Sequence, residues 1–82
     1  MIKKVIVVYD SKADAYLDPM FAQETVDAIR SLQQAVNDPT QKSTISQYPE
    51  DFAMFHIADY DTKTGTITML KAPQIVTGKH WV

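Results

Sequence analysis

The segment Tyr48–Gly65 constrains the fold of this chain more than any other. It opens on Tyr48-Pro49-Glu50-Asp51, where the proline lacks an amide hydrogen and closes the preceding stretch. It ends on Asp61-Thr62-Lys63-Thr64-Gly65, where glycine can supply the positive φ that a tight hairpin turn requires. The segment therefore predicts a strand over Phe52–Tyr60 that turns back into a second strand over Thr66–Leu70.

Residues of the first of these strands separate onto two faces, because successive side chains of a strand point in opposite directions. The alternation assigns one face to Phe52, Met54, His56, Ala58 and Tyr60, and the other to Ala53, Phe55, Ile57 and Asp59. Both faces carry an aromatic side chain, so both need a neighbour or a ligand.

The remainder of the chain supplies a strand and a helix. Val5–Tyr9 is rich in β-branched residues and predicts a strand buried on both faces. Asp18-Pro19 is a helix-start pattern, and Asn37-Asp38-Pro39 ends the helix. Residues on one helical face recur at spacings of three and four, namely Ala22, Val26, Ile29, Leu32 and Val36.

These elements predict one small α+β domain that spans residues 1–82, of the order β-α-β-β, with Gln74–Thr77 as a candidate last strand. We expect an antiparallel sheet with the helix packed on one face, a loop over residues 10–17 and a flexible loop over residues 40–47. The chain has 82 residues and no cysteine, so no disulfide can reinforce it. Domains this small often gain stability by oligomerising, which predicts a homodimer.

Charge and hydropathy limit the function. The formal net charge is −2 and the sequence pI is near 5.5, whereas nucleic-acid-binding domains commonly have a pI above about 9. No apolar run approaches the roughly 20 residues of a membrane span, so no membrane partner is expected. The apolar run after Met1 is too short and too β-branched for a signal peptide.

Catalytic and metal-binding patterns are weak. The spacing of Asp59, Asp61 and Lys63 only partly matches a calcium loop, because a lysine stands where the fifth-position oxygen ligand belongs. His56 and His80 would have to converge with a carboxylate to bind a metal. With two glycines and no cysteine, the chain lacks phosphate-cradling loops and thiol nucleophiles. We expect neither an enzyme, a metal nor a cofactor.

The aromatic strand admits two interpretations. Its rings could stack on nucleic-acid bases while lysines contact phosphates, and residues 62–82 contain lysines but no acidic side chain. Alternatively, the aromatics are core and the lysines are solvated. Both can hold, because one helix covers only one face of a sheet. The candidate nucleic-acid-binding residues are Lys3, Lys4, Lys63, Lys71, Lys79, Phe52, His56, Tyr60 and Trp81.

The chain resembles the small nonstructural protein of gokushoviruses and related microviruses, which are single-stranded-DNA phages. The blocks that carry the resemblance are Val8-Tyr9-Asp10-Ser11-Lys12-Ala13, Ala28-Ile29-Arg30, Ala35-Val36-Asn37-Asp38-Pro39, Tyr48-Pro49-Glu50-Asp51 and Phe55-His56-Ile57, with Asp61 and Gly65 in the turn. The resemblance implies an accessory role in DNA synthesis or packaging, on single strands and in the host cytoplasm. It implies no particular binding residues.

Two hypotheses follow. In the first, a non-catalytic homodimer binds single-stranded DNA through strand aromatics and lysines. In the second, the open sheet face or edge engages a viral replication or assembly protein without touching DNA, which the acidic pI favours.

Overall fold

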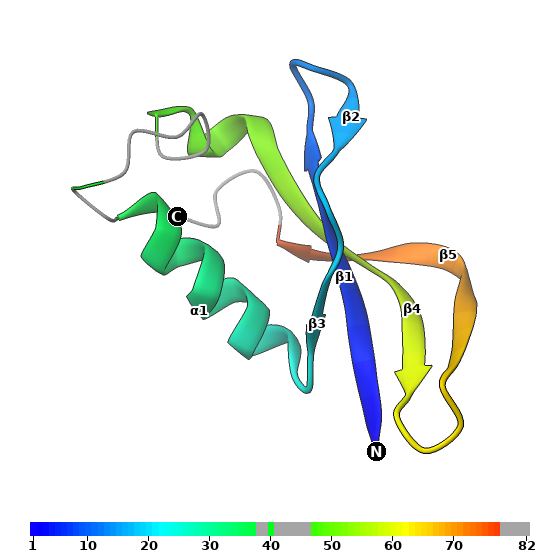
Figure 1. The fold of residues 1–82 in the computed structure, drawn as a ribbon. Helices are drawn as coiled ribbons and strands as arrows, with labels where there is room; N and C mark the ends of the chain where they lie inside the picture. The colour runs from blue at the N-terminus through cyan, green and yellow to red at the C-terminus, as the bar shows by residue number, and fades with distance from the viewer. Residues whose placement is uncertain (38–39, 41–46, 78–82) are drawn as a thin grey trace.

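The computed structural model describes residues 1–37, 40 and 47–77, which form a curled antiparallel sheet with one α-helix beside it (Figure 1). The elements in chain order are β1 (Ile2–Asp10), β2 (Ala15–Tyr16), β3 (Met20–Ala22), α1 (Thr25–Val36), a 3-10 turn (Pro49–Asp51), β4 (Phe52–Asp61) and β5 (Thr66–Thr77). The strands lie in the order β2-β1-β4-β5, and β3 also pairs with β1. This arrangement confirms the predicted α+β class with a helix on one face of an antiparallel sheet.

The two predicted long strands and the hairpin are confirmed. β1 and β4 pair along their whole lengths, and residues 5–8 of β1 are buried on both faces. In the turn after β4, Gly65 has a φ of 74° and its amide donates to the Asp61 carbonyl at 2.8 Å. The Asp61 carboxylate accepts the Lys63 amide at 2.9 Å. The turn is a hairpin held by its first residue.

The predicted helix start at Asp18-Pro19 is wrong. Met20–Ala22 is instead the short strand β3, in which Met20 lies opposite Ile6 and Ala22 opposite Lys4. The helix begins at Thr25. Pairing with β1 satisfies backbone groups that a longer helix would leave unpaired at the sheet edge, and this tertiary gain outweighs the local start signal. β2 also pairs with β1, so a short strand lies within the predicted loop over residues 10–17.

The predicted end of the helix is confirmed, because α1 ends at Val36 and the Asn37 amide donates to the Gln33 carbonyl at 3.0 Å. Its buried face contributes Ala28 and Leu32. The core between helix and sheet consists of Ile6, Val8, Ala28, Leu32, Phe52 and Met54, with Met20, Ala22, Ile29, Val36 and Val76 packed against it. Val26, predicted for the same face, is 46% exposed.

A β-bulge at Ile57 overturns the predicted alternation of β4. Ile6 of β1 lies opposite His56, and Val5 lies opposite Ala58, so Ile57 is the extra residue. Neighbouring residues of β1 point to opposite faces, so His56 faces the helix while Ala58 faces away from it. Everything after His56 has therefore exchanged faces relative to the sequence-based prediction.

β5 also departs from a regular ladder. Its Met69 lies opposite Ala58 and its Gln74 opposite His56. Residues 70–73 of β5 are therefore extra residues that interrupt the regular pairing with β4. Pro73 lies in this irregular stretch, where its missing amide hydrogen costs no ladder bond. The predicted strands over Thr66–Leu70 and Gln74–Thr77 are thus two parts of one strand. Of the predicted loop over residues 40–47, positions 41–46 lie outside the described residues.

Candidate nucleic-acid interface

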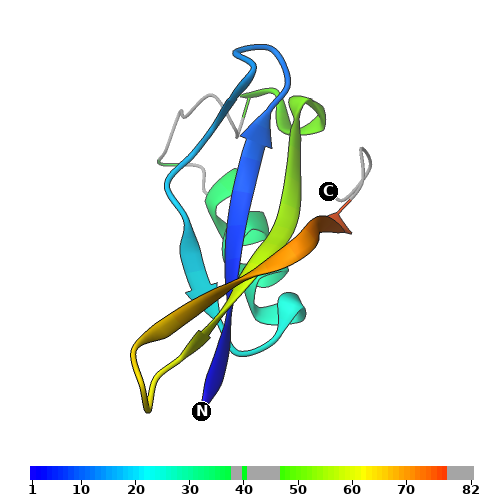
Figure 2. The ribbon, with the colours of Figure 1, turned by 90° about the vertical axis from the view of Figure 1, so that its right-hand side faces the viewer.

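The sheet has one face that α1 does not cover. In Figures 1 and 2, α1 and most of β5 lie on opposite sides of β1. Register with Val5 and Val7 of β1 defines the side chains of this open face, which are Lys3, Val5, Val7, Tyr9, Tyr16, Phe21, Ala53, Phe55, Ala58, Tyr60, Ile67, Met69 and Ile75. At its centre Val5, Val7 and Ala58 are buried although no helix covers them, because the sheet curls and larger side chains surround them.

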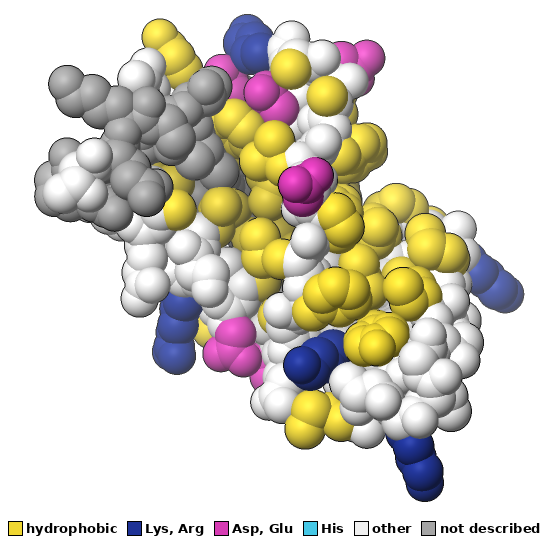
Figure 3. All heavy atoms as spheres, viewed as in Figure 1, with side chains coloured by type: hydrophobic (Ala, Val, Ile, Leu, Met, Phe, Trp, Pro, Cys, Tyr) yellow, Lys and Arg dark blue, Asp and Glu magenta, His cyan; other side chains and the backbone are white. Residues whose placement is uncertain are grey.

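Large hydrophobic side chains of the open face are exposed. The exposed fractions are 62% for Tyr16, 51% for Phe21, 54% for Ile67, 64% for Met69 and 70% for Ile75. Figure 3 shows hydrophobic side chains gathered over β1, β4 and β5, with lysine and arginine side chains mainly at the margins. Exposed hydrophobic side chains gathered on one face are typical of interaction surfaces.

Two aromatic pairs lie on the open face. The ring centroids of Phe21 and Tyr60 are 5.3 Å apart with planes at 58°, and those of Tyr9 and Tyr16 are 4.9 Å apart with planes at 48°. Tilted pairs at this spacing are favourable contacts that hold both rings in place. Lys3 lies directly opposite Tyr60, on the same face. One end of the open face therefore combines a fixed aromatic pair with a cation.

The structure brings together only part of the predicted binding residues. Lys3 and Tyr60 lie side by side, whereas Lys4 lies opposite Asp59 on the face that bears the helix. Phe52 and His56 are 3% and 8% exposed, so neither ring is available for stacking. Phe52 is buried because it packs in the core on the helix side. The bulge places Tyr60 on the opposite face from Phe52 and His56.

The other predicted lysines differ in position. Lys63 lies in the hairpin turn and Lys71 in the irregular part of β5, and both are exposed. Lys79 and Trp81 lie outside the described residues. Sequence reasoning missed Phe21, because it fell within the helix predicted to begin at Asp18-Pro19. The alternation of Met20-Phe21-Ala22 is too short a signal to have found it.

His56 has a structural role. Its Nε2 lies 2.9 Å from Asp59 Oδ1 and 3.0 Å from the Ala58 carbonyl oxygen. A carbonyl oxygen only accepts, so Nε2 carries the hydrogen and donates to both. The bulge places His56 and Asp59 on one face, three residues apart. Through Nε2 the histidine thus links the two residues that follow the bulge.

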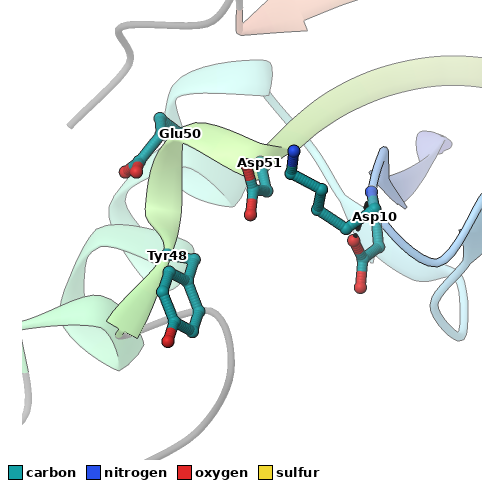
Figure 4. Close-up of a pocket in the computed structure, with 5 residues that line it drawn as sticks. Asp10, Tyr48, Glu50 and Asp51 are labelled. Carbon is teal, nitrogen blue, oxygen red and sulfur yellow. Dashed lines mark hydrogen bonds between the residues drawn. The ribbon is translucent and has the colours of Figure 1, made fainter.

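A separate pocket of about 540 Å³ lies where the end of β1 meets the 3-10 turn (Figure 4). It is lined by Asp10, Lys12, Tyr48, Glu50 and Asp51. The Asp10 carboxylate accepts the amides of Lys12 and Ala13 at 3.0 and 3.2 Å, so it stabilises the turn after β1. Within the described residues, no group of three or more His, Cys, Asp or Glu side chains could hold a metal ion.

The strand end beside this pocket is fixed by further contacts. Ser11 donates to the Asp51 carbonyl through both its amide and its hydroxyl, each at 2.9 Å. The Tyr9 hydroxyl donates to the Asp14 carboxylate, and this hydrogen bond raises the pKa of Tyr9 above its ordinary value. These contacts join β1 to the 3-10 turn and to the β1–β2 turn.

The structure is a small α+β domain in which one sheet face is open and carries exposed apolar side chains. The described part of the chain contains no helix that is both long and apolar enough to cross a membrane. Residues 3–80 match the phage ORF5 protein family, and the chain belongs to that family. The expectation of a phage protein is thereby confirmed. No curated protein and no solved structure matches the chain.

Proposed function

We propose that this chain is a non-catalytic accessory protein of a gokushovirus or related microvirus, which binds single-stranded DNA through one end of its open face. The observation that carries the proposal is the Phe21–Tyr60 ring pair beside Lys3. Membership of a phage family supports it, as does the resemblance to microvirus nonstructural proteins. In this role the protein acts in the host cytoplasm, where the phage genome is copied and packaged.

Binding would combine two terms. Bases stack on the pair formed by the exposed Phe21 ring and the half-buried Tyr60 ring, and stacking is typically worth about 1–3 kcal/mol per base by alanine substitution. Phosphates contact Lys3 and, beyond the pair, Lys63 of the hairpin. The stretch from residue 62 to 77 contains no acidic side chain that would repel the backbone. Both terms are independent of base identity, so binding is expected to show little sequence preference.

A second candidate function rests on a different part of the open face. Ile67, Met69 and Ile75 are aliphatic or thioether side chains and are 54–70% exposed. They offer no flat ring for a base, but they suit the apolar core of a protein interface. In this alternative, the protein engages a viral replication or assembly protein and does not touch DNA.

The deciding experiment is binding of a labelled single-stranded oligonucleotide over a salt series. We expect affinity to fall log-linearly with salt, and Lys3→Ala to reduce the slope by about 0.7 if Lys3 neutralises one phosphate of a single strand. Tyr60→Ala should weaken binding roughly 5- to 150-fold, which corresponds to the loss of one stacked base.

Tyr48→Ala is the matched control, because Tyr48 is 52% exposed but lies beside the separate pocket. It should bind as the unmodified chain does. Circular dichroism of each variant establishes that the fold is retained. Absence of binding at low salt would reject the proposal and favour the protein-interaction alternative, as would equal losses in Tyr48→Ala and Tyr60→Ala.

A further inference from the structure

The outer edge of β5 is a sheet edge that no other described strand covers. β5 ends the strand order, and among the described residues it pairs with β4 alone. Its first part, residues 66–69, pairs regularly with β4, and the irregular stretch begins at Leu70. An antiparallel neighbour on one side leaves about half of a strand's backbone amides and carbonyls directed outward. Such an edge is a template for another strand.

Residues 66–70 carry none of the devices that normally protect an edge. The sequence Thr66-Ile67-Thr68-Met69-Leu70 contains no charge, proline or glycine, and these are the usual means of preventing edge pairing. Three of its residues are β-branched, which favours the extended conformation. All but Leu70 are exposed. The segment is therefore ready to add a strand.

We propose that this edge pairs with the same edge of a second copy, in antiparallel fashion about a two-fold axis at Thr68. In this register Ile67 lies opposite Met69 of the second copy, and Thr66 lies opposite its Leu70. The segment is thus self-complementary, as an isologous interface requires. Ile67 and Met69 of both copies form one apolar cluster, and such cross-strand pairs stabilise a sheet.

The charges of β5 and its turn agree with this register. The paired segment itself carries no lysine, because Lys63 lies in the hairpin turn and Lys71 in the irregular stretch of β5. No lysine opposes a lysine, so pairing avoids the like-charge repulsion that destabilises opposed strands. A partner strand of unrelated sequence has no such built-in match, and for this reason the occupant is a second copy of the chain.

The dimer joins two sheets edge to edge and leaves the open faces uncovered on the same side. A five-residue pairing is smaller than the roughly 800 Å² per partner of a standard interface. The association is therefore concentration-dependent rather than permanent. The dimer does not depend on DNA binding, and its tests contain no DNA. Either proposal can therefore be wrong without affecting the other.

A single-cysteine test captures a weak dimer. The chain has no cysteine, so any disulfide in Thr68→Cys joins two copies. Opposed residues of antiparallel strands have Cα atoms about 4.5–5.5 Å apart, within the range of a disulfide. Under mild oxidation we expect Thr68→Cys to form covalent dimer at least tenfold faster than Ile75→Cys. Ile75 is the matched control, since it lies on the same strand and is 70% exposed.

Sedimentation equilibrium over a concentration series provides the second measurement. Thr68→Lys sets two lysines against each other at the axis and should abolish the dimer, whereas Ile75→Lys should retain it. If Ile75→Lys abolishes the dimer and Thr68→Lys does not, the copies associate through the open face and the edge pairing is wrong. A chain that stays monomeric throughout, with equal cross-linking of both cysteine variants, also overturns the proposal.

Discussion

At the scale of single residues, this chain uses one residue type in opposite ways. Ile6 is 0% exposed in the core, whereas Ile75 is 70% exposed on the open face. Both lie in β-branched or apolar stretches that predict strand, so local sequence does not separate them. What separates them is α1, which covers the face that Ile6 occupies.

This difference predicts unequal effects of the same substitution. Ile6→Ala leaves a cavity among Val8, Phe52 and Met54 and should lower the free energy of unfolding by about 2–5 kcal/mol. Ile75→Ala removes the same atoms from an exposed site and should change the free energy by no more than about 0.5 kcal/mol. Urea unfolding of both variants provides the comparison. Similar losses would mean that Ile75 is covered in solution.

At the scale of elements, the bulge in β4 decides which side chains share a face. Without Ile57 as an extra residue, Tyr60 would lie on the helix side with His56. With it, Tyr60 contacts Phe21 on the open face, and Asp59 reaches His56 on the other. The candidate interface therefore depends on one inserted residue in one strand.

The hydrogen bond across the bulge should have a measurable coupling energy. His56 is buried, but the Asp59 side chain is 41% exposed, so solvent weakens the interaction. In a double-mutant cycle of His56→Ala and Asp59→Ala, we expect a coupling of about 0.5–1.5 kcal/mol in unfolding free energy. Pairing His56→Ala with Asp27→Ala, on the exposed surface of α1, is the control cycle and should give additive effects. Additivity in both cycles would show that the bulge does not need this contact.

Sequence patterns predicted the elements whose signals are local. The β-branched run of β1, the turn at Gly65 and the helix end at Asn37 each depend on a few neighbouring residues. The predicted helix start was wrong because Met20 and Phe21 pair with β1. These partners are 14 or more residues apart in the sequence. The bulge was not predicted, because the alternation of residue types along β4 continues through Ile57 without any break.

At the scale of the whole molecule, one helix and a curled sheet leave a sheet face that α1 does not cover and, among the described residues, an outer β5 edge without a paired strand. Burial on one side gives the domain its core, and the other side carries exposed apolar side chains. The proposed functions divide this surface, with the aromatic end assigned to DNA and the β5 edge to self-association. If both proposals hold, edge pairing keeps both aromatic ends accessible and doubles the lysines available to one DNA strand.

Self-association should make the melting temperature of the protein depend on its concentration. Because only folded chains pair, mass action predicts that the Tm rises with protein concentration. Over a hundredfold range we expect an increase of a few degrees, since about 1 kcal/mol shifts the Tm of a domain this size by 4–8 °C. Scanning calorimetry of the unmodified chain and of Thr68→Lys makes the measurement. The variant should show a constant Tm, and a constant Tm in both would argue against pairing.

The sequence by itself determined the α+β class, the β1 strand, the β4–β5 hairpin and the end of the helix, because periodicity and turn chemistry act over a few residues. It also marked the aromatic strand as the place where function would be decided. Only the tertiary structure decided that Phe52 and His56 are buried, that Phe21 joins Tyr60 beside Lys3, and that among the described strands β5 pairs with β4 alone. These outcomes depend on the register between distant strands and on which face the helix covers, and neither is encoded in any local stretch of the chain.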